Sequence, residues 1–241
     1  MRWIYISPHL DDAVLSAGGL IYEQTQNGIP VETWTVVCGF PATKKLSPFA
    51  EYLHQEWGMS SAEEVVRNRR DEDKRAASIV GAKPVHFDVP DCIYRQGPDG
   101  EFLYGNIFVP LHEAEVDLPN QIAAKLAPHL EKDDVLVCQL AVGGHVDHLL
   151  VRQAAEKLER PLLYLADIPY LLNTPEDLAG KVDGMKEVVH PITEAGLKSW
   201  QDAVAAYASQ MAMLFEGDEM MRTVIQSYWE ERKGIRLWEV T

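Results

Sequence analysis

Two short stretches of the sequence place histidines and aspartates at spacings that suit a metal site. The first, PHLDD, holds His9, Asp11 and Asp12, and the second, GGHVDH, ends at His148. Two neutral imidazoles and one carboxylate with a fourth position open make a hydrolytic zinc site, because that position takes the water to be activated. We therefore predict that His9, Asp12 and His148 bind the metal. Because adjacent side chains cannot both face one ion comfortably, Asp11 is the candidate general base.

The second stretch also supplies His145 and Asp147. His145 and His148 lie three residues apart at a predicted helix start, so one can bind the metal while the other faces the substrate. Asp147 could hydrogen-bond the substrate-facing imidazole, hold its tautomer and favour its protonated form. A protonated histidine can stabilise an oxyanion and give a proton to a departing amine. A base, a metal and a cationic histidine are the parts that amide hydrolysis requires.

These residues also have structural interpretations. Asp11 or Asp12 alone is a helix N-cap more often than a catalytic group. A single surface histidine is usually only solvated. Three acids and three histidines confined to two strand-to-helix junctions are difficult to assign to capping alone, and this favours the metal site.

Three further residues are candidates for substrate binding. Arg70 could hydrogen-bond sugar hydroxyls or a phosphate, or it could form a salt bridge with Asp73 or Glu72. Asp91 follows a predicted strand and could bind sugar hydroxyls or form a turn. Tyr170 could line the pocket or donate to the oxyanion, or it could be a core tyrosine.

The elements that must position these residues alternate along the chain. Apolar runs at 4–7, 31–38, 85–89, 134–140 and 162–165 are typical of buried strands, and helical patterns separate them. The predicted fold is α/β, with a Rossmann-like, mostly parallel sheet flanked by helices. In such sheets ligands bind outside the carboxyl ends of the strands. We therefore expect neighbouring strand tips to bring the two motifs together.

The remaining segments predict elements that accompany this sheet within one domain. The pattern breaks at 39–60, which predicts a long, partly helical insertion, and Ser60 or Ser61 can then cap a charged helix that stops near Gly81. From residue 173 onward the pattern is mostly helical and predicts a C-terminal helical element. Because no repeat or long linker interrupts the sequence, we predict one domain over residues 1–241.

The composition restricts the classes of function. Hydrophobic residues make up 46% of the 241 residues and charged residues 24%, as is ordinary for a globular protein. The formal net charge of −15 argues against nucleic acid and against an anionic membrane as partners, because both repel an acidic surface. Cys38, Cys92 and Cys138 form no CxxC pair, which favours free thiols in a reducing compartment. With no signal peptide and no apolar stretch near the roughly 20 residues of a membrane span, we expect a cytoplasmic protein.

The motifs point to a family. PHLDD followed far downstream by HVDH resembles the LmbE-like/PIG-L family of zinc-dependent N-acetylglucosaminyl deacetylases, whose pattern is PHxDD with HxDH. RRDED at 69–73 and YASQM at 207–211 resemble weaker signatures of the same family. Leu10 stands where the family often has proline. The resemblance covers most of the predicted Rossmann-like core.

This resemblance implies a reaction and a set of roles. A Zn²⁺ ion, or another divalent metal, is held by the three predicted ligands. Asp11 is then the general base toward the water, and His145 is the oxyanion-stabilising acid that Asp147 orients. The implied substrate is a small-molecule N-acetylated sugar conjugate, with N-acetylglucosaminyl as the first candidate. The resemblance leaves open whether the chain forms a homo-oligomer.

Two other functions remain as alternatives. A metal-dependent phosphoesterase uses similar ligands, but many such enzymes use two metals and only one ligand set is visible in this sequence. A non-catalytic sugar- or nucleotide-binding Rossmann-like module is the second. The stretch SAGG at 16–19 does not give GxGxxG, so a dinucleotide site is weakly supported. Metal analysis separates these functions, because a pure binding module has no need of zinc.

Overall fold

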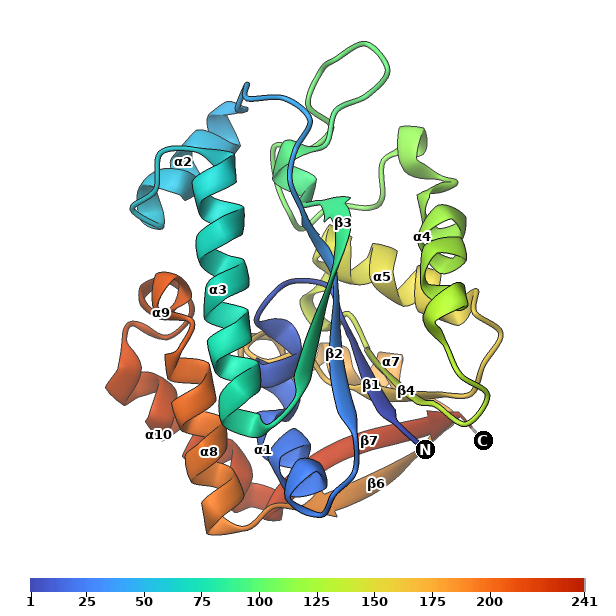
Figure 1. Ribbon diagram of the computed structural model, residues 1–241, viewed down its shortest axis with the longest axis vertical. Helices are drawn as coiled ribbons and strands as arrows, with labels where there is room; N and C mark the ends of the chain where they lie inside the picture. The colour runs from blue at the N-terminus through green and yellow to red at the C-terminus, as the bar shows by residue number, and fades with distance from the viewer. Residues whose placement is uncertain (241) are drawn as a thin grey trace.

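One mixed sheet organises the protein. The computed structural model describes residues 1–240, with every side chain except that of position 232. Within these residues seven strands lie in the order β3-β2-β1-β4-β5-β7-β6 (Figure 1). The strands are β1 (Trp3–Ser7), β2 (Val31–Gly39), β3 (Lys83–Pro90), β4 (Val135–Gln139), β5 (Leu162–Leu165), β6 (Met185–Pro191) and β7 (Gly234–Val240). Strands β1 to β5 pair in parallel, which confirms the predicted Rossmann-like, mostly parallel sheet.

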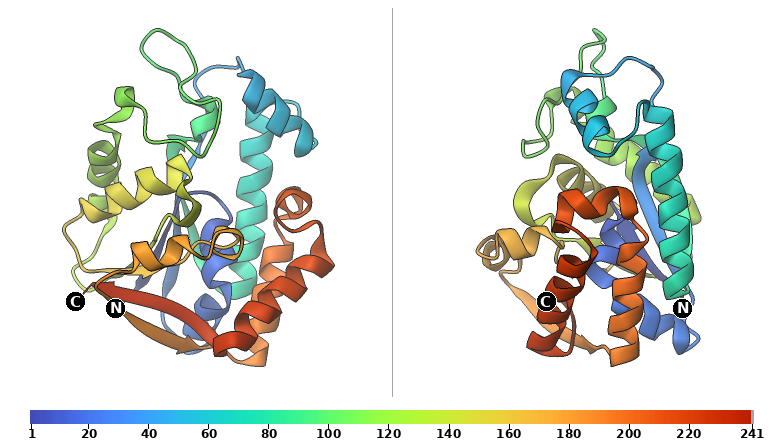
Figure 2. Two further views of the ribbon diagram at one scale, coloured as in Figure 1. Left: turned by 180° about the vertical axis from the view of Figure 1, so that it is seen from behind. Right: turned by 90° about the vertical axis from the view of Figure 1, so that its left-hand side faces the viewer.

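Helices cover both faces of this sheet. They are α1 (Asp12–Gln26), α2 (Pro48–Glu56), α3 (Ala62–Val80), α4 (Leu118–Leu126), α5 (Val146–Glu156), α6 (Tyr170–Asn173), α7 (Asp177–Lys181), α8 (Glu194–Ala205), α9 (Ala208–Phe215) and α10 (Asp218–Arg232). On one face α1, α3, α8 and α10 share a core with the strands, and on the other face α4 and α5 do so (Figures 1 and 2). None of the described helices combines the length and apolar character that crossing a membrane requires.

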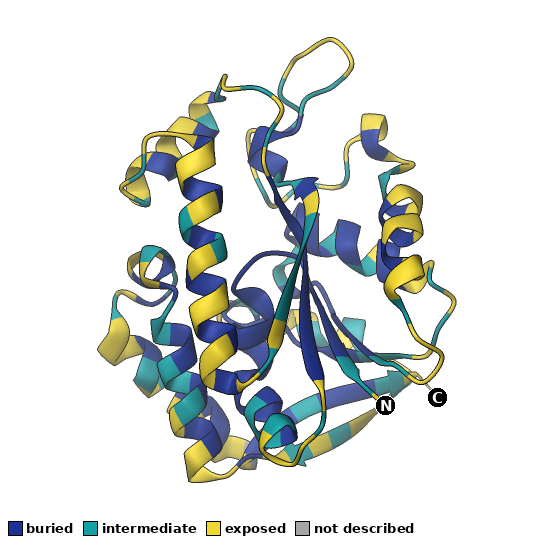
Figure 3. Cartoon of the chain, viewed as in Figure 1, coloured by how far each residue is buried: buried dark blue, intermediate teal, exposed yellow. Residues whose placement is uncertain are grey.

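The two cores follow from the alternation of side chains along the strands. Tyr5 of β1 packs with α1 and α8, whereas Ile4 and Ile6 pack with α4 and α5. Figure 3 shows the central strands buried and the outer surfaces of the helices exposed. Gly18 lets α1 approach α8 closely, because a Cβ there would lie 2.6 Å from Cδ1 of Trp200. The glycines of SAGG therefore serve helix packing.

The sheet brings the two motifs to one edge. Strands β1 and β4 are parallel neighbours, with Ile6 opposite Cys138, so the turns that follow them meet. The turn after β4 contains Gly143, whose φ of +77° lies in the left-handed region that favours glycine. A Cβ at Gly143 would also lie 3.0 Å from the Cβ of Tyr170. A glycine at this position therefore allows the turn after β4 and the turn after β5 to pack closely.

The helix boundaries predicted from caps are confirmed, but the C-terminal prediction was incomplete. Ser61 caps α3 by accepting from the Glu64 backbone N–H, and Gly81 ends α3 with φ +77°. The C-terminal segment contains the predicted helices and also β6 and β7, which extend the sheet by antiparallel pairing. The polar residues of β6 follow no apolar pattern because this edge strand is largely exposed. Its pairing with β7 depends on contacts that only the folded chain supplies.

Candidate active site

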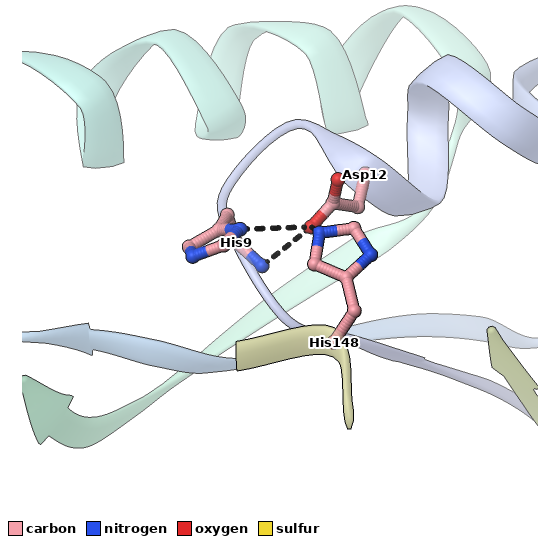
Figure 4. A group of neighbouring side chains, drawn as sticks. All are labelled: His9, Asp12 and His148. Carbon is pink, nitrogen blue, oxygen red and sulfur yellow. Dashed lines mark hydrogen bonds and ion pairs between the residues drawn. The ribbon is translucent and has the colours of Figure 1, made fainter. Parts of the chain in front are cut away.

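His9, Asp12 and His148 converge on one point (Figure 4). Their ligand atoms lie within 4.8 Å of one another, and all three residues are buried. The Oδ2 atom of Asp12 is 3.3 Å from Nδ1 of His9 and 3.4 Å from Nε2 of His148. His9 comes from the turn after β1, Asp12 is the first residue of α1, and His148 comes from the first turn of α5. The PHLDD and HVDH motifs, which are distant in sequence, therefore lie together in the fold as predicted.

The donor set fits a divalent metal. Nε2 of His148 is buried and has no hydrogen-bond partner among the described residues. On the other side of this ring Nδ1 lies 2.6 Å from the carboxylate of Asp167, so its proton is held there and Nε2 presents a lone pair. A buried lone pair beside a carboxylate and a second imidazole suits a metal of the zinc type.

The electrostatics also favour a cation at this point. Burial opposes charge on both His9 and Asp12. Nevertheless, hydrogen bonds to Asp12 and Asp147 raise the pKa of His9 well above its ordinary value. The imidazoles of His148 and His9 outweigh the burial of Asp12 and lower its pKa. The carboxylates thus create a negative potential that a metal ion would neutralise.

Asp167 is a site residue that the sequence reasoning missed. It is fully buried and accepts both from Nδ1 of His148 and from the backbone N–H of Val142. The signal that could have found it is its position directly after the 162–165 strand, at the same carboxyl edge as the two motifs.

We expect Asp167→Asn to weaken metal binding by about 10- to 100-fold, the usual cost of removing a partner of a metal-ligating histidine. The amide supplies one acceptor oxygen, whereas Asp167 uses two, one for His148 and one for Val142. Metal affinity measured by competition with a chelator tests this. Asp88→Asn is the matched control, because the Asp88 side chain is 82% exposed. Wild-type affinity in Asp167→Asn would contradict the assignment.

The carboxylate of Asp147 does not orient His145 as predicted. It lies 3.2 Å from Nε2 of His9, and it accepts from Nη1 of Arg95 and from the backbone N–H of Cys92 at 3.0 Å. Its side chain therefore orients His9, one of the three predicted metal ligands. The physical reason is that Asp147 is fully buried beneath the site, where the guanidinium of Arg95 compensates its charge.

His145 is held by the backbone instead. Its Nδ1 accepts the Asp147 backbone N–H at 3.1 Å, so the ring proton lies on Nε2. Burial and the neighbouring rings of His9 and His148 lower the pKa of His145 well below its ordinary value. Both effects disfavour the protonated form predicted for His145, and the neutral ring would present an Nε2–H donor.

Asp11 lies buried next to Asp12 and pairs with an arginine. It is buried, and its side chain makes no capping hydrogen bond to α1, so the capping interpretation fails. Burial raises the pKa of the Asp11 carboxyl, and the positive charge of Arg69 opposes this rise. The two groups are 3.3 Å apart, and the Arg69 guanidinium lies 5.4 Å from the ring centroid of Trp57.

Arg69, which the sequence reasoning missed, takes the position that was expected for Arg70. The guanidinium of Arg70 donates to the carbonyls of Cys38 and Phe87 and pairs with Asp88, away from the residues that line the pocket. Consecutive helical residues point about 100° apart, so only one of the two arginines can face the site. The buried face of α3 includes Arg69 and supplies the periodic signal that could have identified it.

Asp91 and Tyr170 both line the pocket that His9 and Asp12 border. Oδ1 of Asp91 accepts from the Ile93 backbone N–H, and its Oδ2 lies 3.7 Å from Nε2 of His9. Asp91 therefore forms a turn and also faces the site. The ring of Tyr170 packs edge-on against His148 at 5.3 Å between centroids. The remaining wall is largely apolar and comes from Leu15, Leu53, Trp57, Ile93, Ile107, Pro169, Met213 and Leu214.

Comparison with known proteins places this site in a family. The family model described as PIG-L, GlcNAc-PI de-N-acetylase, matches residues 4–158, which include both motifs. The chain belongs to the PIG-L family. This confirms the family predicted from PHLDD and HVDH, together with the enzyme class, a metal-dependent N-deacetylase.

Individual relatives of this PIG-L family member are also deacetylases. The chain is 24% identical to 2'-N-acetylparomamine deacetylase of Niallia circulans, over 99% of this chain and 94% of that protein. It is similar to the zinc-inhibited form of teicoplanin deacetylase Orf2, with TM-score 0.85, 27% identity and coverage of 100% and 98% of the two chains. It is also similar to the A40926 pseudoaglycone deacetylase Dbv21, with TM-score 0.79, 29% identity and coverage of 100% and 97%.

Proposed function

We propose that this protein is a zinc-dependent hydrolase that removes an N-acetyl group from an amino sugar conjugate, with N-acetylglucosaminyl conjugates as the first candidates. The observation that carries the proposal is the convergence of His9, Asp12 and His148, with the buried Nε2 of His148 lacking a hydrogen-bond partner among the described residues. The three relatives described above support the reaction, since they are named as deacetylases of 2'-N-acetylparomamine, of teicoplanin and of the A40926 pseudoaglycone.

The residues around the metal position supply the proton chemistry. When bound, zinc would act as a Lewis acid toward the amide carbonyl and toward water. Asp11 takes a proton from the attacking water as the new carbon–oxygen bond forms. His145 donates a hydrogen bond from Nε2–H to the developing oxyanion. The proton is on Nε2 because Nδ1 accepts the Asp147 backbone N–H.

The second half of the reaction breaks the carbon–nitrogen bond. The departing nitrogen requires one proton, and Asp11 holds the proton that it took from water. We therefore assign the oxyanion contact to His145 and the return of the proton to Asp11. Of the two roles first predicted for His145, it keeps stabilisation of the oxyanion, and protonation of the departing amine passes to Asp11. Acetic acid and a free amine are formed, the acid loses its proton to the amine or to solvent, and Asp11 is again a carboxylate.

Pocket residues provide the contacts for a sugar. Arg69 and Asp91 present a charged donor and a carboxylate acceptor to the cavity. Paired donors and acceptors of this kind suit vicinal hydroxyl groups. The ring of Tyr170 and the apolar wall restrict the space beside the metal ligands.

A free-amine assay with metal quantification tests this function. Protein loaded with one equivalent of zinc should release acetate and amine in equal amounts from at least one of several N-acetylated substrates. The panel comprises N-acetylglucosaminides, 2'-N-acetylparomamine, and acetylated forms of teicoplanin and of the A40926 pseudoaglycone. Zinc is kept at one equivalent because Orf2 has a zinc-inhibited form. Metal-loaded protein that cleaves none of them, while releasing alcohol from phosphodiesters, would favour the phosphoesterase instead.

A further inference from the structure

Helix α9 carries a pocket residue that the proposed mechanism does not use. Gln210 lines the same cavity as His9 and Asp11, and only 3% of it is exposed. It lies in the stretch YASQM, to which the sequence reasoning assigned no role. Figures 1 and 2 show α9 beside α3.

A hydrogen-bond relay fixes the orientation of the Gln210 amide. The carboxylate of Glu72 accepts the backbone N–H of Ser209 at 2.9 Å and its hydroxyl at 2.6 Å. Because a carboxylate only accepts, the Ser209 hydroxyl must donate its single proton to Glu72. Its oxygen can then only accept, and it does so from Nε2 of Gln210 at 2.9 Å.

With one Nε2 proton donated to Ser209, the Gln210 amide keeps its acceptor oxygen and a second N–H. With Nε2 directed at Ser209, the remaining polar heavy atom of the amide is the acceptor Oε1. Among the described residues no hydrogen bond reaches Oε1. Gln210 is therefore a buried side chain whose acceptor has no protein partner and which borders the cavity next to the proposed base.

The relay itself is rigidly anchored. Glu72 is only 2% exposed, and three residues earlier on α3 stands Arg69, which pairs with Asp11. The adjacent Asp73 accepts the hydroxyl of Tyr207 at 2.9 Å, which fixes the start of α9. Helix α3 thus holds both Asp11, the proposed base, and the side of the pocket that Gln210 forms. The same helix connects the RRDED and YASQM stretches.

We propose that Gln210 is a specificity-determining residue whose Oε1 accepts a hydrogen bond from a donor of the bound amino sugar, with Glu72 and Ser209 as positioning residues. The donor is a ring hydroxyl or the amide N–H. This inference rests on the proposed function, because it requires an amino sugar in the pocket.

Kinetics of Gln210→Met test the contact. Met preserves the shape of the side chain and removes the acceptor, so KM should rise about tenfold while kcat and metal content stay within about twofold. Gln201→Met is the matched control, since the Gln201 amide bonds to the Arg222 carbonyl on α10 and does not line the pocket. Wild-type KM in Gln210→Met would overturn the proposal.

The relay has its own test. Ser209→Ala frees the Gln210 amide to turn and should raise KM about threefold, whereas Ser209→Thr retains the hydroxyl and should restore wild-type kinetics. Equal KM values for Ser209→Ala, Ser209→Thr and wild type would refute the positioning role.

The donor is identified by pairing Gln210→Met with altered substrates, which are monodeoxy analogues of the sugar and an N-methylated amide. The wild-type protein should bind the analogue that lacks the true donor more weakly than it binds the parent substrate. Gln210→Met, which has already lost this contact, should bind the analogue and the parent substrate equally well. Strictly additive losses for every analogue would contradict the inference. If the wild-type protein turns over the panel, a failure of these tests counts against the Gln210 contact alone. If the wild-type protein turns over none of the substrates, both the Gln210 contact and the proposed function are overturned.

Discussion

Asp11→Asn is expected to lower kcat by about 10²- to 10⁴-fold and to leave the bound metal unchanged. The variant retains the size of the side chain and an oxygen that can accept from Arg69, which lies 3.3 Å from Asp11. It cannot take a proton from water. Because Asp11 is not among the three converging ligands, metal content should match that of the wild type.

Steady-state kinetics with metal analysis on the same sample measure this effect. The control is Asp88→Asn, which makes the same chemical change at an exposed carboxylate and should have wild-type kinetics. Substantial turnover in Asp11→Asn with full metal occupancy would remove Asp11 as the base. Loss of metal together with turnover would instead indicate that Asp11 takes part in metal binding.

His148→Ala is expected to lose metal and, with it, detectable turnover. His148 supplies the one buried ring nitrogen of the cluster that has no hydrogen-bond partner among the described residues, so its removal would delete a proposed ligand outright. Metal affinity should fall by more than the roughly 10- to 100-fold expected for a supporting residue such as Asp167. Chelation of the wild type should abolish turnover in the same way, and added zinc should restore it.

Metal quantification after gel filtration measures this loss, and circular dichroism reports whether the variant is folded. His190→Ala serves as the control, because His190 lies on the edge strand β6, outside the metal cluster. A folded His148→Ala protein that retains one equivalent of metal would refute the ligand assignment and the proposed reaction with it.

The sequence by itself determined the parts of the site that are local. His9 and Asp12 are three residues apart in one turn after a buried strand, and His148 follows another apolar strand. Buried parallel strands read as nearly continuous apolar runs, and their carboxyl ends share one edge. These two facts were enough to predict that PHLDD and HVDH meet, and the pairing of β1 with β4 confirms the placement.

Only the tertiary structure decided the partners of each charged group. Asp147 was expected at His145 because they are close in sequence, yet its carboxylate faces His9 and Arg95, which are distant in sequence. Arg69 and Arg70 are adjacent and chemically identical, so residue type could not distinguish them. The direction of each side chain from α3, and the partners Asp11 and Asp88 that it meets there, depends on how that helix packs.

The same limit explains Asp167, Gln210 and the strands β6 and β7. Asp167 acquires its role from a 2.6 Å contact with His148, and the acceptor of Gln210 is oriented by a relay that begins at Glu72. Hydrogen-bond direction and antiparallel edge pairing are properties of contacts between segments that are distant along the chain. A local pattern of residue types determines elements and motifs, whereas the burial of charge and the partners that satisfy it exist only once those elements have packed.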